Sequence, residues 1–113
     1  MSKGADKLLT IVKELYPNHK VVLEHNIADH GALFLDIYLP DLSLAFEFDG
    51  EQHSNYSSFF HGSRENFIAA KKRDLHKSEA CEQKDILLIR IKYNDPLTKD
   101  FVFDKIEEAL NDQ

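Results

Sequence analysis

The sequence has a single cysteine, no long apolar run and no excess of basic residues. Cys81 has no partner for an internal disulfide, which is typical of a protein in a reducing compartment such as the cytoplasm. No segment approaches the roughly 18 apolar residues of a membrane-spanning helix. Residues 1–16 carry charges throughout, so no signal peptide is expected. There is no internal repeat or linker, and we expect one domain over residues 1–113.

The charge balance is acidic, with 14 Lys and Arg against 20 Asp and Glu and a formal net charge of −6. This balance counts against nucleic-acid binding, because contacts with phosphates need cations. However, a metal site concentrates carboxylates whose charge the cation offsets. Residues 64–77 also contain five basic and two acidic residues, a local sum of 5 − 2 = +3. On charge alone, a solvated helix face is the preferred interpretation of this segment.

The spacing of apolar residues predicts an α/β domain. The predicted order is helix, three strands, helix, strand, helix, over residues 5–16, 20–27, 33–39, 42–49, 64–83, 86–93 and a last helix opened by Asp95-Pro96. The first three strands suit an antiparallel meander, and the fourth, which follows a helix, suits a parallel crossover. We therefore expect a mixed sheet flanked by helices.

Two predicted strands bring acidic side chains together. In 33–39 alternation places the odd-numbered apolar residues on one face and Asp36 on the other, whereas 42–49 places Glu47 and Asp49 on one face. If residues 40 and 41 alone form the turn, Asp36 and Glu47 are diagonal neighbours with Cβ atoms on the order of 7 Å apart. A four-residue turn keeps them on one face. Such a pair can share Mg²⁺; the alternative is a solvated face that happens to be acidic.

His53 follows Asp49 by four residues, just after Gly50. A glycine permits a sharp turn at the end of the strand, which would bring His53 back over the carboxylates. An imidazole titrates near pH 6.5 and can take a proton from an attacking water. The alternative is an ordinary loop histidine, since the chain has five others.

Three further charged residues occupy positions that predict a partner. Asp74 shares a helix face with the less polar Phe67, Ala70, Ser78 and Cys81. In the functional interpretation Asp74 orients His53 or binds metal. In the alternative it forms a structural ion pair with Lys71 or Lys77.

Glu24 lies on the strand expected beside the hairpin, where it either joins the carboxylates or is simply exposed. Arg90 interrupts the last apolar strand and needs a carboxylate or phosphate partner, so it is either a structural counter-ion or a phosphate clamp.

Several segments resemble one nuclease family. The resemblance rests on three segments and one residue. They are Phe-Glu-Phe-Asp-Gly-Glu-Gln-His at 46–53, Lys-Arg-Asp-Leu-His-Lys at 72–77, Leu-Leu-Ile-Arg-Ile-Lys-Tyr at 87–93, and Asp36, which lies eleven residues before Glu47. Together they resemble nucleases related to the very-short-patch-repair endonuclease, a branch of the PD-(D/E)XK superfamily. The resemblance covers about residues 20–93, and four short motifs in order are fairly specific. It implies a restriction-endonuclease-like core.

A subgroup of phage homing endonucleases has a Glu, Asp, x-His, Asp arrangement, which Glu24, Asp36, Gln52-His53 and Asp74 match. The resemblance implies that Asp36 binds metal, His53 acts as the base and Asp74 supports the site. The superfamily's lysine two residues after the strand glutamate is absent, because Asp49 stands there. Whether Glu47 or Asp49 is the better ligand is therefore open.

The resulting prediction is a Mg²⁺-dependent DNA endonuclease domain, with Mn²⁺ as a substitute, acting in a bacterial or phage-infected cell. The expected metal ligands are Asp36, Glu47 and Asp49, and the expected contacts with double-stranded DNA are Arg64, Lys71, Lys72, Lys77 and Arg90. A homodimer or a separate DNA-binding domain would supply further affinity. The alternative is the same fold with weakened chemistry, used to bind DNA or protein.

Overall fold

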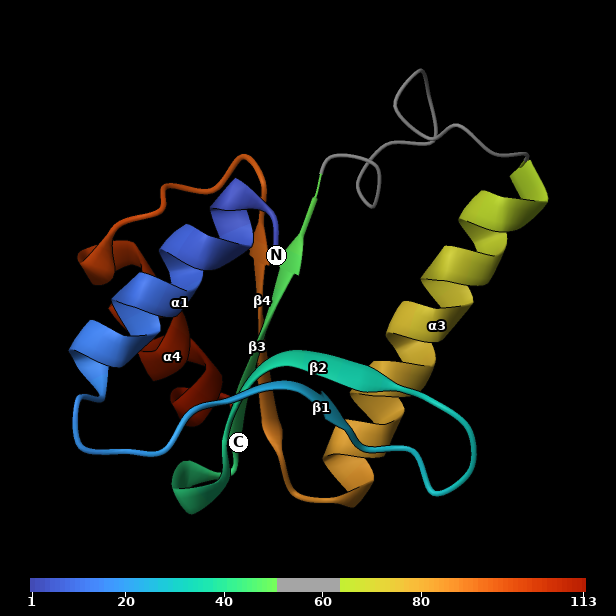
Figure 1. Ribbon diagram of the computed structural model, residues 1–113, viewed down its shortest axis with the longest axis horizontal. Helices are drawn as coiled ribbons and strands as arrows, with labels where there is room; N and C mark the ends of the chain where they lie inside the picture. Colours follow the sequence, from blue (N-terminus) through green and yellow to red (C-terminus); the bar gives the residue numbers. More distant parts are fainter. Residues whose placement is uncertain (51–63) are drawn as a thin grey trace.

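The computed structural model describes residues 1–50 and 64–113, and its helices and strands follow the predicted order (Figure 1). Their bounds are α1 Lys3–Leu15, β1 Val22–Asn26, β2 Phe34–Leu39, a 3-10 turn Pro40–Leu42, β3 Leu44–Asp49, α3 Arg64–Gln83, β4 Leu87–Lys92 and α4 Lys99–Asn111. None of the helices in these two ranges is long and apolar enough to cross a membrane.

The sheet is mixed, with strand order β1-β2-β3-β4. β1 pairs with β2 and β2 with β3 in antiparallel fashion, while β4 lies parallel to β3. Helices α1 and α4 cover one face and α3 lies against the other (Figure 1). The predicted α/β class, with an antiparallel meander, a crossover strand and flanking helices, is confirmed.

The turn between β2 and β3 differs from the two-residue form considered above. Leu39 pairs with Leu44, so four residues separate the strands. Pro40–Leu42 form the 3-10 turn, and Ser43 closes it in the left-handed region at φ 49°. Because a four-residue loop preserves the parity of the strands, the acidic residues stay on the predicted face of β3.

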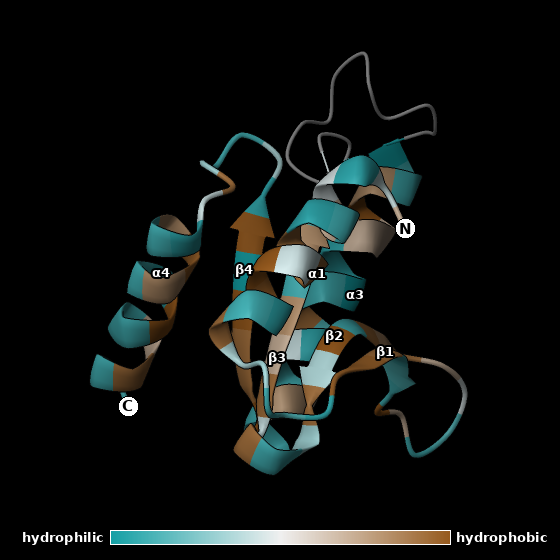
Figure 2. Ribbon diagram, turned by 60° about the vertical axis from the view of Figure 1, so that its left-hand side comes forward, coloured by the Kyte–Doolittle hydropathy of each residue, from teal (hydrophilic) through white to brown (hydrophobic). Residues whose placement is uncertain are grey.

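Each face of the sheet has its own hydrophobic core. The larger core joins α1 and α4 to residues such as Ile37, Phe46 and Ile91, and the smaller one joins the end of α3 to Leu35 and Ala45. Figure 2 shows the hydrophobic residues along β4 and on the side of α4 that faces it.

The expectation that Leu35 and Ile37 share a face is wrong, because β2 changes faces at Asp36. Leu35 packs in the core beneath α3, whereas Ile37 packs in the core beneath α1 and α4. Glu24, in the neighbouring part of β1, has φ 49°, and the Asp36 N–H bonds to a side chain instead of a strand. These interruptions of the ladder let the two halves of β2 face opposite cores.

Helix α3 spans the predicted residues, but it packs on the sheet mainly through its last turns. Cys81 is its one fully buried side chain, while Ile68 and Leu75 are 43% and 57% exposed. The first half of α3 stands away from the sheet (Figure 1). Ile68 and Leu75 lie off the face predicted around Asp74, whose residues are half-buried at Phe67, Ala70, Asp74 and Ser78 and buried at Cys81.

Helix α1 is fixed at its start by a cap and by a close approach to β3. The Ser2 side chain accepts a hydrogen bond from the Ala5 N–H at 3.2 Å. Gly4 lies directly over the Phe48 ring, so a Cβ added at Gly4 would come 2.2 Å from Phe48 Cζ. Only glycine allows this contact between α1 and the strand that carries the acidic residues.

Gly4→Ala is expected to lower the free energy of unfolding by about 1–3 kcal/mol, because the added methyl group must displace a packed ring. Helix propensity alone predicts the opposite sign, since alanine favours a helix over glycine. Urea denaturation would measure the change, with Thr10→Ala on the exposed side of α1 as the control. A stabilised Gly4→Ala protein would show that the ring moves aside at no cost.

Candidate functional site

Asp36 and Glu47 meet where β2 and β3 stop pairing through their backbones. The last paired residues before them are Ile37 and Phe46, so one further step places the two carboxylates opposite each other. The Asp36 N–H donates to Glu47 Oε2 at 2.6 Å, and the Phe48 N–H donates to Asp36 Oδ2 at 2.9 Å. Each carboxylate thus bonds the partner strand's backbone, and this reciprocal arrangement fixes both side chains.

Glu47 also contacts α3. It is 5% exposed, the one charged residue among 1–50 and 64–113 that is fully buried. The Lys77 Nζ donates to Glu47 Oε1 at 2.5 Å, and the Lys77 side chain is itself only 13% exposed. Both oxygens of Glu47 therefore have a donor.

Burial raises the pKa of Glu47, and the negative charge of Asp36 raises it further, whereas the bond from Lys77 opposes both effects. A cation beside Glu47 is what keeps a buried carboxylate ionised. The site therefore favours positive charge, and Lys77 supplies it.

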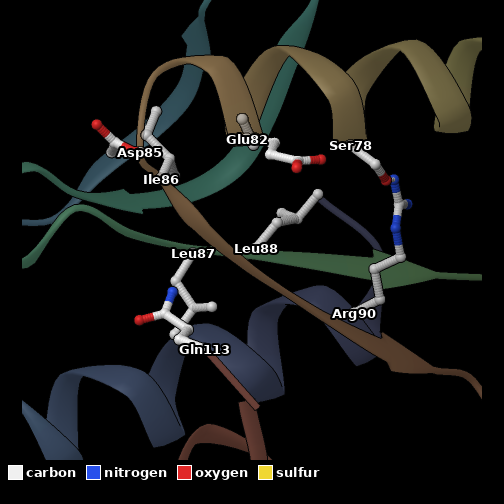
Figure 3. Close-up of a pocket in the computed structure, with 9 residues that line it drawn as sticks. Ser78, Glu82, Asp85, Ile86, Leu87, Leu88, Arg90 and Gln113 are labelled. Carbon is white, nitrogen blue, oxygen red and sulfur yellow. Dashed lines mark hydrogen bonds between the residues drawn. The ribbon is translucent and has the colours of Figure 1, made fainter. Parts of the chain in front are cut away.

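Asp49 and Asp74 face a different cation, Arg90. The Arg90 Nη2 donates to the Asp74 carbonyl oxygen at 2.7 Å and to Ser78 Oγ at 3.0 Å, and Figure 3 shows the side chain extending from β4 toward Ser78. Its Nη1 lies 3.7 Å from Asp49 Oδ1 and 3.9 Å from Asp74 Oδ1. Of the two interpretations of Arg90, these contacts are those of a structural counter-ion.

Glu24 lies next to Asp36 on the neighbouring strand. The residues on either side of Glu24 pair with the residues on either side of Asp36. Glu24 is exposed and has φ 49°, a conformation that costs a residue other than glycine on the order of 1–3 kcal/mol. The strand is thus distorted beside the carboxylate pair.

Two members of the predicted metal set, Asp36 and Glu47, are brought together. No group of three or more His, Cys, Asp and Glu side chains suited to a metal ion occurs in the described parts of the chain. Mg²⁺, however, is commonly held by one or two carboxylates together with water and substrate phosphate. Asp36 and Glu47 fit that donor set, while Asp49 contacts Arg90. Glu47 contacts Lys77 in the same way, so the choice between Glu47 and Asp49 as the second ligand stays a prediction.

The remaining predicted residues separate into two groups. Gln52 and His53 lie outside the described residues, so the match of Gln52-His53 to the x-His motif and the role of His53 as base remain predictions. Arg64, Lys71 and Lys72 are exposed on α3, as a DNA-contacting role requires, whereas Lys77 is turned inward to Glu47. The site role of Lys77 was missed; its signal was its position three residues after Asp74, on the same side of the helix.

A cavity of about 470 Å³ lies beside Arg90, between the end of α3, β4 and Gln113 (Figure 3). Cys81 lines it, but burial raises the pKa of this thiol, and the nearby charge of Glu47 raises it further. A thiol with a raised pKa is a poor nucleophile at neutral pH. Cys81 is therefore a weak candidate for a nucleophile.

No protein-family model matches the sequence, and no solved structure matches the chain. Three curated viral proteins are similar to parts of it. Uncharacterized protein 094L of Frog virus 3 is 41% identical over 63 residues, which are 55% of this chain and 41% of that protein. Uncharacterized protein 033L of Invertebrate iridescent virus 3 is 27% identical over 86 residues, or 76% of this chain and 44% of the relative.

Uncharacterized protein 307L of Invertebrate iridescent virus 6 is 29% identical over 75 residues, which are 66% of this chain and 38% of the relative. The chain thus spans about two fifths of the length of these relatives. Their viral origin agrees with the broader expectation of an infected host cell, while the bacterial or phage setting stays a prediction.

Proposed function

We propose that the chain is a divalent-metal-dependent nuclease domain of the PD-(D/E)XK type that hydrolyses phosphodiester bonds of double-stranded DNA. The supporting observation is the pairing of Asp36 and Glu47 across β2 and β3, with each carboxylate held by the partner strand's backbone. Two fixed carboxylates on adjacent strands form the kind of oxygen donor set that Mg²⁺ or Mn²⁺ uses. The cytoplasm of an infected cell is the proposed place of action.

In this proposal Asp36 and Glu47 would hold a divalent metal ion, and the ion would supply positive charge beside the scissile phosphate. A hydrogen bond from the Phe48 N–H holds the Asp36 carboxylate in place, and a hydrogen bond from the Asp36 N–H holds the Glu47 carboxylate. The proposed role of His53 is to take a proton from the attacking water. Arg90 fixes the position of Asp74, which in turn supports the site.

The exposed basic residues of α3, Arg64, Lys71 and Lys72, are the proposed contacts with the DNA backbone. Three cations on a chain with a formal net charge of −6 give weak binding, because affinity for DNA grows with the number of phosphates neutralised. The proposal therefore includes a second copy of the chain or a separate DNA-binding domain. The viral relatives are longer than the part that this chain matches, so they have room for a further domain.

The first experiment incubates supercoiled plasmid with the purified chain in Mg²⁺, in Mn²⁺ and in chelator. We expect nicking or linearisation with either ion and none with chelator, because the ion supplies the charge that stabilises the reacting phosphate. His53→Ala is expected to lose cleavage while keeping Asp36-dependent metal binding. Cleavage that persists in chelator would refute the proposal, and full activity of His53→Ala would remove the histidine from it.

The second candidate is a nuclease-fold module that binds DNA or protein without cleaving. The observation that favours it is the contact of Lys77 with Glu47, which already neutralises the buried carboxylate without a metal ion. Isothermal titration separates the two functions. A nuclease binds Mg²⁺ or Mn²⁺ in a way that Asp36→Asn abolishes, whereas a docking module need not bind either ion.

A further inference from the structure

Lys77 bonds one of the two Glu47 oxygens that a cation on the Asp36–Glu47 pair could use. Glu47 Oε2 accepts the Asp36 N–H at 2.6 Å, so Oε1 is the oxygen that faces away from the β2 backbone. That oxygen accepts a hydrogen bond from the Lys77 ammonium, with the nitrogen at 2.5 Å. A metal ion that uses Glu47 Oε1 must therefore share one oxygen with a positive charge.

We propose that a divalent cation binding to Asp36 and Glu47 displaces the Lys77 ammonium from Glu47, so that metal binding and the position of Lys77 are coupled. This inference rests on the proposed metal site. The two cations repel each other strongly in a largely buried site, where water screens charge poorly. The Glu47 and Lys77 side chains are 6% and 13% exposed, so this condition holds.

The displaced ammonium needs to move only a short way to reach water, because the Lys77 side chain is already 13% exposed in the metal-free chain. A lysine stem of four flexible carbons can turn its charged end outward without moving the helix. In the metal-free chain Lys77 thus acts as a counter-ion that keeps Glu47 in position, and it leaves when the metal arrives.

The direct test uses the wild-type chain and reductive methylation of lysines, followed by peptide mass spectrometry. We expect Lys77 to be protected without metal and to react about tenfold faster with saturating Mg²⁺, because its charge is expelled to solvent. Lys84 is the internal control, since its side chain is already 40% exposed. In Asp36→Asn, Mg²⁺ should not change the labelling of Lys77.

A second test measures Mn²⁺ affinity by isothermal titration in Lys77→Gln, whose amide lacks the charge but can still donate a hydrogen bond to Glu47. We expect binding about tenfold tighter than in wild type, because the competing charge is gone. Lys84→Gln should bind as wild type does.

The outcomes separate this inference from the function on which it rests. Suppose that metal binds in an Asp36-dependent way but Lys77 stays protected, or that Lys77→Gln binds metal no more tightly than wild type. Either result overturns the displacement of Lys77 and leaves the metal site standing. An absence of Asp36-dependent binding in every variant overturns both.

Discussion

Asp36→Asn is expected to lower the rate of metal-dependent DNA cleavage by roughly 10³-fold, which corresponds to about 4 kcal/mol of lost transition-state stabilisation. The substitution removes the charge of one proposed metal ligand and changes little else. An asparagine keeps a side-chain oxygen for the Phe48 N–H, which bonds Asp36 Oδ2 at 2.9 Å. The loss of activity should therefore come without unfolding.

Plasmid cleavage under single-turnover conditions measures the rate, and urea denaturation of the same protein measures the fold. Asp41→Asn is the matched control, because Asp41 lies in the turn of the same hairpin and contacts only His19 among the described ion pairs. Asp41→Asn should cleave at the wild-type rate. An Asp36→Asn protein that is folded and cleaves normally would refute the site.

The alternation of apolar and polar residues predicts which face of a strand each side chain occupies. Alternation along β3 predicts Glu47 and Phe46 on opposite faces, and in the structure Glu47 contacts α3 while Phe46 packs in the other core. The parallel position of β4 followed from the helix that precedes it. The restriction-endonuclease-like identity of the core stays a proposal.

The change of face at Asp36 could not be predicted, because it depends on contacts between strands. A strand is expected to alternate throughout unless something interrupts its ladder. Here the interruption is the Glu47 carboxylate, which accepts the Asp36 N–H from eleven residues away. The sequence shows that both acids are present, but not that they bond each other's backbones.

The partners of the buried charges show the same limit. The sequence indicates that Asp74 and Arg90 each need an opposite charge, and it offers Lys71 and Lys77 as ion-pair partners of Asp74. In the structure Arg90 contacts Asp74, and Lys77 contacts Glu47. A helix wheel gives the face of a residue, whereas its partner depends on which strand that face meets.

Lys77→Met is expected to lower the free energy of unfolding of the metal-free chain by about 3–5 kcal/mol, because it leaves the Glu47 charge buried without its counter-ion. The double variant Glu47→Gln with Lys77→Gln should stay within about 1 kcal/mol of wild type, since a neutral pair avoids the cost of burying charge. Its amides can also hydrogen-bond each other and the Asp36 N–H.

Urea denaturation as a function of pH measures both effects. Burial raises the folded-state pKa of Glu47 above its unfolded value, so between those two values the folded chain binds more protons and Glu47's contribution to stability falls as the pH rises. The double variant should lack this contribution.

Lys84→Met is the matched control, because it breaks a Lys84–Asp29 pair whose side chains are 40% and 86% exposed. Its cost should be about 0.5 kcal/mol or less. If Lys77→Met costs no more than Lys84→Met, Glu47 does not depend on Lys77 to remain buried and charged. The lysine would then be a neighbour of the carboxylate pair and not its counter-ion, and a metal ion would have nothing to displace.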